Sequence, residues 1–166
     1  MSYQSEAQLE QQLIDQLKGQ GYDEVAIPDY DSLVANFRVQ FEKFNAAKLV
    51  KPLSDKEWER VLNHLNGKSI FESAKIMRDK YVLERDDGSK VYLAFIDEDH
   101  TKNLFQVSHQ TTVVGKYTNR YDVTLLVNGL PLVQIELKRR GIDIKEAVNQ
   151  IMRYRKHSYN GLYHYI

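Results

Sequence analysis

The sequence contains no cysteine, and its 23 lysines and arginines are balanced by 23 aspartates and glutamates. Without cysteine there are no disulfides, no cysteine zinc site and no thiol nucleophile. A reducing compartment suits such a chain, so we expect a cytoplasmic protein. No apolar run approaches the roughly 20 residues of a membrane span. The polar N-terminus lacks the features of a secretory signal, and we expect no membrane partner.

What is present is an ordinary globular composition. The 166 residues are 42% hydrophobic and 28% charged, which supports one domain with a core and argues against disorder. The charges are unevenly placed, because residues 1–110 carry 14 basic and 19 acidic side chains while residues 111–166 carry 9 and 4. Zero net charge argues against coating a polyanion by bulk charge, and the positive C-terminal third slightly favours a polyanion there.

The first half of the chain has helical periodicity. Ser5 with Gln8, and Ser54 with Glu57, have the spacing of capping boxes at helix starts. The pattern predicts helices over residues 5–18, 31–47, 54–65 and 69–79.

Glu10 stands out in the first of these helices. At about 100° per residue, it falls inside the apolar stripe that runs from Leu9 to Leu17. A surface helix normally keeps its carboxylates off that face. Two interpretations stay open: a first turn that frays, or a Glu10 side chain that points into a polar site.

From residue 80 the period changes to two, which predicts strands and an α/β (α+β) fold. Asp143 is a candidate N-cap for a last helix, in which Ile144, Val148 and Ile151 form the expected core-facing stripe. The pattern predicts strands at 81–85, 91–96, 104–114, 121–127 and 132–138, a helix at 143–157, and the start of another strand at 161–166.

Three charged residues carry the chemical signal. Asp122 lies near the start of one predicted strand, and Glu136 and Lys138 share a face near the end of the next. Their neighbours are apolar, where bare charges are costly to bury. Two carboxylates, with the peptide oxygen of Leu137, suit a hard divalent cation such as Mg²⁺, for which Mn²⁺ substitutes. Such a cation beside Lys138 supplies the parts needed to hydrolyse a phosphodiester. The alternative is a surface salt bridge unrelated to Asp122.

The shared site depends on strand register. A two-residue turn at Asn128–Gly129 with regular pairing would place Asp122 opposite Ile135, with Glu136 on the other face. Pro131 lacks the N–H that regular pairing needs. We therefore predict a three-residue connection or a β-bulge between residues 127 and 133. A clean two-residue hairpin would remove the site.

The last predicted helix carries further polar residues. Gln150 and Tyr154 are four apart and share one face, from which both can hydrogen-bond phosphate oxygens. Taken alone, these two residues are better explained by an ordinary amphipathic helix with a half-buried tyrosine. The nearby basic residues either steer a phosphate backbone or are simply solvated charges; they are Arg139, Arg140, Arg153, Arg155 and Lys156.

The run NRYDVTLLVNGLPLVQIELKRRG resembles the nuclease core of type I restriction enzyme R subunits, the HsdR family. The similarity extends to SEAQLEQQLIDQLKGQGY, NLFQVSHQTTV and EAVNQIMRY, and so covers most of the chain. It implies a PD-(D/E)xK fold, in which helices flank a mixed sheet with Mg²⁺ at the strand ends, and a helical insertion near residues 30–80.

The resemblance also implies roles for individual residues. Asp122, Glu136 and Lys138 match the three catalytic motif positions. Tyr121 stands where the name-giving proline often does, which touches a backbone preference and not the chemistry. Three more site residues are implied by the match to the QxxxY element and to an acidic position on the first helix, namely Gln150, Tyr154 and Glu10.

Type I R subunits act on double-stranded DNA with methyltransferase and specificity subunits and carry ATP-driven translocase domains. This sequence has no G-x-x-x-x-G-K-[ST] phosphate loop, so ATP would act only in motor domains outside it. We expect residues 1–166 to be a single nuclease domain, the N-terminal fragment of a longer motor subunit. Two alternatives stay open: a non-catalytic DNA-clamping or motor-docking module, and a stand-alone repair or resolvase-type nuclease.

Overall fold

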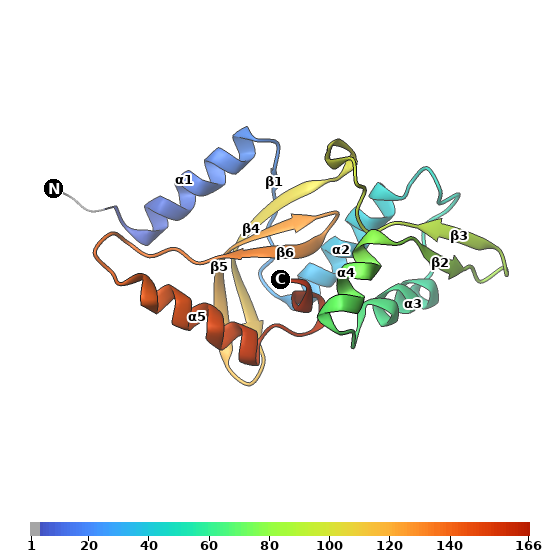
Figure 1. Cartoon of the computed structure of the whole chain (residues 1–166). Helices are drawn as coiled ribbons and strands as arrows, with labels where there is room; N and C mark the ends of the chain where they lie inside the picture. Colours follow the sequence, from blue (N-terminus) through green and yellow to red (C-terminus); the bar gives the residue numbers. More distant parts are fainter. Residues whose placement is uncertain (1–3) are drawn as a thin grey trace.

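The computed structural model describes residues 4–166, which form five α-helices, two short 3₁₀ helices and six strands (Figure 1). The helices are α1 (Glu6–Gly19), α2 (Tyr30–Phe44), α3 (Asp55–Leu65), α4 (Ile70–Arg78), η1 (His100–Lys102), α5 (Ile144–His157) and η2 (Gly161–Tyr165). The strands are β1 (Asp23–Glu24), β2 (Tyr81–Glu84), β3 (Lys90–Leu93), β4 (Phe105–Val114), β5 (Thr118–Val127) and β6 (Leu130–Ile135).

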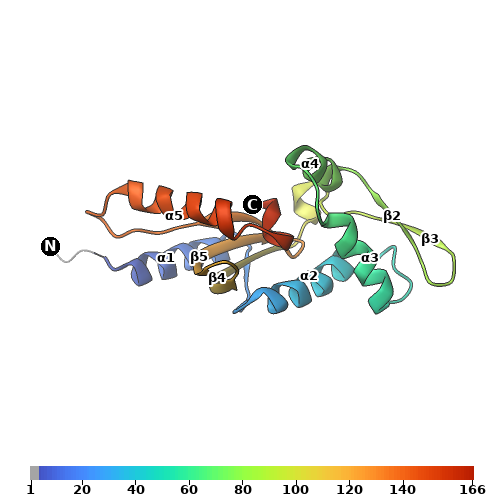
Figure 2. The same ribbon diagram turned by 90° about the horizontal axis from the view of Figure 1, so that it is seen from below.

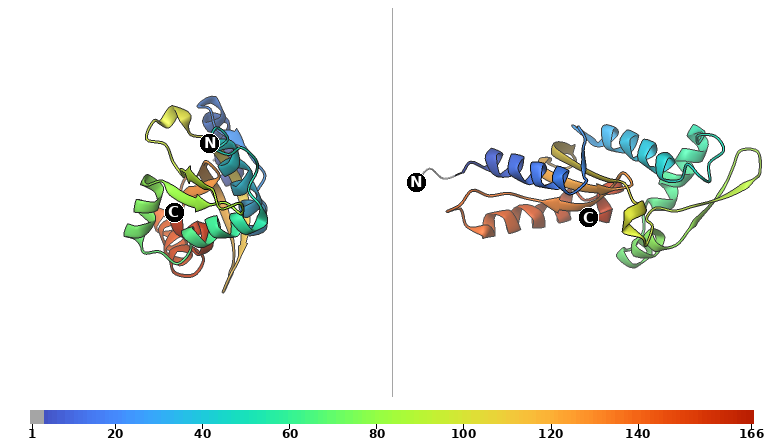
Figure 3. Two further views of the ribbon diagram at one scale, coloured as in Figure 1. Left: turned by 90° about the vertical axis from the view of Figure 1, so that its right-hand side faces the viewer. Right: turned by 90° about the horizontal axis from the view of Figure 1, so that it is seen from above.

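A mixed four-stranded sheet, in the order β1-β4-β5-β6, organises the fold. β4, β5 and β6 are antiparallel to their neighbours, and the short β1 runs parallel to β4. Figures 2 and 3 show α5 on one side of this sheet and α1 on the other. The predicted fold class, a mixed sheet flanked by helices, is confirmed. No helix among residues 4–166 is long and apolar enough to cross a membrane.

Serine caps set the helix starts. The Ser5 and Ser54 side chains accept from the amides of Gln8 and Glu57, whose side chains bind back in reciprocal capping boxes. Both predicted boxes are confirmed, and the predicted helices agree with the structure to within three residues at each end. The expected helical insertion consists of α2, α3 and α4, which with the β2–β3 ribbon occupy the far side of the molecule from α1 and α5 in Figure 1.

Two predictions about the C-terminal part are wrong. Residues 161–166 do not extend as a strand, because Gly161 adopts a positive φ of 55° and the chain turns into η2. Leu162 and Tyr163 of η2 are both buried.

The expected core-facing stripe of α5 is also wrong. Ile144 and Val148 are 77% and 50% exposed, and Ile151 is half-buried, whereas Ala147 and Tyr154 are buried. Two stripes with helical spacing compete on this helix. The small Ala147 permits close approach to the sheet, and the large Tyr154 gains more from burial than the aliphatic side chains.

A buried ion pair joins α3 to the β2–β3 ribbon. Arg85 Nε lies 2.8 Å from Glu57 Oε1, and the two side chains are 7% and 2% exposed. Burial alone would raise the pKa of Glu57, but hydrogen bonds from the Ser54 and Asp86 amides and from Arg85 lower it below its usual value. Glu57 therefore stays charged and depends on its partners.

We expect Arg85→Met to lower the free energy of unfolding by about 3 kcal/mol, because it leaves the Glu57 charge buried without its cation. Urea denaturation measures the loss. Arg78→Met is the matched control, since its ion pair with Asp79 is exposed and its removal should leave stability close to wild type. Equal losses in the two variants would contradict this role of Arg85.

Candidate active site

A β-bulge sets the register of the site. Val127 pairs with Leu130 across the two-residue Asn128–Gly129 turn. Farther from the turn, from Leu125 back to Val123, the pairing between β5 and β6 is shifted by one residue. The extra residue is Leu132, directly after Pro131, and the predicted bulge is confirmed.

The bulge brings the two acidic residues together. Val123 faces Ile135, so Asp122 lies opposite Glu136 as the chain leaves β6. Asp122 Oδ2 accepts a hydrogen bond of 2.9 Å from the Leu137 amide, which fixes the segment after the strand to β5. The predicted strand 132–138 is thus three residues too long at its end, because these residues bond a side chain and not a neighbouring strand.

The surroundings of Glu136 disfavour the charged form of its side chain. Burial raises its pKa to about 7, and the neighbouring Asp122 charge adds to the shift. Glu136 Oε1 accepts from Gln134 Nε2 at 3.0 Å, whereas the buried Oε2 has no hydrogen-bond partner among residues 4–166. Two adjacent carboxylates with an unsatisfied buried oxygen fit a divalent cation, which would neutralise both.

Among the described residues, few acidic or histidine side chains are available to bind a metal ion at this site. Within residues 4–166 no group of three or more histidine, aspartate or glutamate side chains is arranged to hold a metal. Asp122 and Glu136 would therefore be the carboxylate ligands, with peptide oxygen and water completing the shell. Mg²⁺ commonly keeps several waters and takes one or two carboxylates. The Leu137 peptide oxygen stays a predicted ligand.

Lys138 follows directly on this segment. It is half-buried and forms no ion pair with any residue in the described part of the chain. It follows Glu136 by two residues in the chain, and its place at the acidic pair stays a prediction.

Gln150 and Tyr154 join α5 to the same part of β5. Gln150 Nε2 donates to the Tyr154 hydroxyl, which itself donates to the Arg120 carbonyl at 3.1 Å. Burial raises the pKa of Tyr154, and the charges of Glu136 and Asp122 add to the rise. The structure therefore joins the predicted glutamine and tyrosine to β5 two residues before Asp122, where they hold α5 against the sheet.

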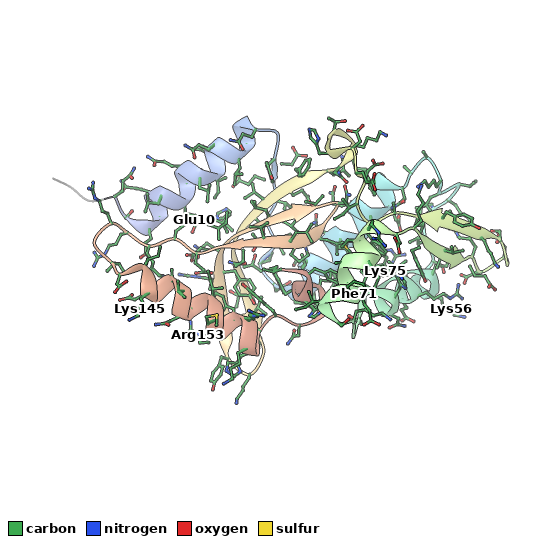
Figure 4. All side chains as sticks on the ribbon, in the orientation of Figure 1. Glu10, Lys56, Phe71, Lys75, Lys145 and Arg153 are labelled. Carbon is green, nitrogen blue, oxygen red and sulfur yellow. The ribbon has the colours of Figure 1, made fainter. Side chains whose placement is uncertain are left out.

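Glu10 points inward, which settles the open question about the first helix. Its side chain is 13% exposed, with Oε1 at 3.0 Å from His109 Nδ1 and Oε2 accepting from Gln110 Nε2. Figure 4 shows Glu10 on the side of α1 that faces the sheet. Both of its oxygens are engaged on β4, so Glu10 acts as a link between α1 and the sheet.

Sequence reasoning missed His109 and Gln110. Gln110 has a positive φ of 55° and lies opposite Asp122, between the pairs His109–Val123 and Thr111–Tyr121. The signal for these residues was the polar interruption SHQTT inside an otherwise apolar strand. His109 and Gln110, which bind Glu10, therefore lie on β4 at the same level of the sheet as Asp122 on the adjacent strand β5.

Positive charge gathers around α5. Lys145 and Arg153 project from the outer surface of this helix in Figure 4. The exposed basic residues of α5 and of the segment before it are Arg139, Arg140, Lys145, Arg153, Arg155 and Lys156.

A mixed α/β fold, with Asp122 on β5 opposite Glu136 just after the edge strand β6, is consistent with a nuclease-like fold. Residues 3–166 match the family described as Type I restriction enzyme R protein N terminus, and the chain belongs to this family.

The similar proteins are longer than this chain, which covers only part of their length. The chain is 56% identical over 168 residues to the Type I restriction enzyme SsaAORF53P endonuclease subunit of Staphylococcus saprophyticus, covering 100% of this chain and 18% of that protein. It is 55% identical, with the same coverage, to the SauMSSORF170P endonuclease subunit of Staphylococcus aureus strain MSSA476. It is 41% identical over 166 residues to the EcoprrI endonuclease subunit of Escherichia coli, covering 96% of this chain and 52% of that protein.

The raised pKa of Glu136 predicts a pH dependence of stability. Between pH 4.5 and about 7 the folded state binds a proton that the unfolded state does not. The contribution of Glu136 to the free energy of unfolding therefore falls as pH rises through this window. We expect Glu136→Gln to gain stability over the metal-free wild type at pH 8 and little at pH 5, measured by urea denaturation.

The matched control is Glu146→Gln, since Glu146 is exposed on α5. Its effect on the free energy of unfolding should be small at both pH values. A Glu136→Gln variant whose stability difference from wild type is the same at pH 5 and pH 8 would contradict the burial of an ionisable pair.

Proposed function

We propose that this domain is the DNA-cleaving part of a type I restriction enzyme R subunit. It would hydrolyse phosphodiesters of double-stranded DNA with Mg²⁺ held by Asp122 and Glu136. The observation that carries the proposal is the bulge at Leu132, which sets the two carboxylates opposite each other and leaves Glu136 Oε2 buried without a partner in the described residues. The names of the similar proteins, all endonuclease subunits, support the same activity.

The surrounding residues support this chemistry. Mg²⁺ bound there would lower the pKa of a water molecule and offset charge on the leaving oxygen. The Leu137 amide fixes Asp122 and the Gln134 amide fixes Glu136, so both carboxylates are held in place in advance. Lys138 would orient the attacking water or offset charge on the phosphate. The basic residues of α5 would bind the phosphate backbone on either side of the cut.

The proposal extends to partners. This chain spans 18% of the length of the staphylococcal relatives, which leaves room for ATP-driven motor domains in the whole subunit. We propose that such a motor delivers DNA to this domain and that methyltransferase and specificity subunits choose the target. A domain that is given its DNA needs little affinity of its own, which agrees with its zero net charge. A cytoplasmic location follows from this role.

Calorimetric titration of the chain with Mn²⁺ tests the metal site. We expect wild type to bind and Asp122→Ala and Glu136→Ala not to bind, because each variant removes one of the two carboxylate ligands. Lys138→Ala is the control and should bind as wild type does. Binding by both acidic variants would contradict the shared site, as would a wild type that binds no Mn²⁺ even with a short DNA duplex present.

The cleavage role requires the assembled enzyme. We expect Lys138→Ala in the full-length R subunit to lower DNA cleavage by about 100-fold or more while ATP hydrolysis continues, because Lys138 acts only at the cutting site. Cleavage is measured on supercoiled plasmid with the methyltransferase and specificity subunits present. A Lys138→Ala enzyme that cuts at the wild-type rate would contradict its role. An assembled wild type that takes up Mn²⁺ but never cuts would favour the DNA-clamping alternative.

A further inference from the structure

A short hydrogen-bond relay reaches Glu136 from the interior of the sheet. Thr124 on β5 pairs in register with Gln134 on β6. Thr124 Oγ1 donates to Gln134 Oε1 at 3.0 Å, and Gln134 Nε2 donates to Glu136 Oε1 at 3.0 Å. Thr124 is 2% exposed, so the relay begins at a buried and well-fixed side chain.

Glu136 and Thr124 together hold the glutamine amide. The carboxylate only accepts hydrogen bonds, so the amide nitrogen of Gln134 faces Glu136 and donates to it. The amide oxygen then faces Thr124, whose hydroxyl donates to it. A flipped amide would place its oxygen against the carboxylate and lose that hydrogen bond.

The relay leaves the two oxygens of Glu136 in different states. Oε1 is held by Gln134, and the buried Oε2 has no hydrogen-bond partner among residues 4–166. A carboxylate held at one oxygen cannot rotate freely. Its other oxygen is therefore presented in a fixed direction beside Asp122, which lies opposite on β5.

We propose that Gln134, held in place by Thr124, is a positioning residue that holds Glu136 so that its Oε2 is the oxygen that binds the divalent cation. This inference rests on the proposed function, since the cation is that of the cleavage site. Gln134 acts through Glu136 and contacts neither DNA nor the reacting phosphate in this role. It lies outside the Asp, Glu and Lys positions of the motif.

Mn²⁺ titration calorimetry of this chain tests the relay. Gln134→Leu removes the donor with little change in size, and Thr124→Val removes the hydroxyl that donates to the Gln134 amide oxygen. We expect each to weaken Mn²⁺ binding about 10-fold, the size of effect known for groups that hold metal ligands. Thr124→Ser keeps the hydroxyl and should bind Mn²⁺ as wild type does.

Gln106→Leu is the matched control. Gln106 is a buried glutamine on the same sheet as the half-buried Gln134, but its amide bonds Asn36 on α2. We expect it to lower thermal stability without changing Mn²⁺ affinity. If Gln134 had a purely structural role, Gln134→Leu would behave like Gln106→Leu, with lower thermal stability and unchanged Mn²⁺ affinity.

Solvent exchange of the Gln134 side-chain amide, followed by ¹⁵N–¹H NMR, tests the relay without metal. We expect slow exchange in wild type and Thr124→Ser, and faster exchange in Thr124→Val and Glu136→Ala.

The two proposals fail in different ways. Wild-type Mn²⁺ affinity in Gln134→Leu and Thr124→Val, with binding lost in Glu136→Ala, would overturn the relay and leave the metal site standing. Fast amide exchange in wild type would overturn the relay as well. A wild type that binds no Mn²⁺ even with a short DNA duplex present would overturn the metal site and the role of Gln134 with it.

Discussion

The register between β5 and β6 is the constraint on which the rest of the site depends. Side chains of a strand alternate between faces, so a shift of one residue moves every following side chain to the other side. The extra residue at Leu132 makes that shift and sets Asp122 opposite Glu136. Without it, the acidic pair, the Leu137 amide contact and the Gln134 relay would each be lost.

Asp122 and Glu136 repel each other when both are charged, so neighbouring residues must hold them together in the metal-free protein. Burial and the Asp122 charge raise the pKa of Glu136 to about 7, so the metal-free arrangement is held together by its neighbours. Tyr154 braces α5 on one side through the Arg120 carbonyl, and Glu10 ties α1 to β4. The two helices thereby lock the sheet at the level where the carboxylates meet.

Periodicity and residue type were sufficient for the five α-helices, for strands β2 to β6 and for the acidic pair, but not for the two-residue β1 or for η2, where a strand was predicted. Pro131 after a tight turn was sufficient for the bulge, because a missing N–H is visible in sequence. Which face of α5 is buried was not predictable. Two sets of residues on this helix have the spacing of a buried stripe, and only contact with the sheet decides that the set with Ala147 and Tyr154 is buried. The contacts of His109 and Gln134 depend on which strands meet at which register, and a single strand does not reveal that.

The most direct test of the account is the anomalous diffraction of Mn²⁺ in crystals of this chain grown with that ion. We expect a strong anomalous peak within bonding distance of Asp122 and of Glu136 Oε2, with Glu136 Oε1 still bound to the Gln134 amide. A structure of the same crystals with no peak at this position, and with the two carboxyl groups sharing a proton instead, would contradict it.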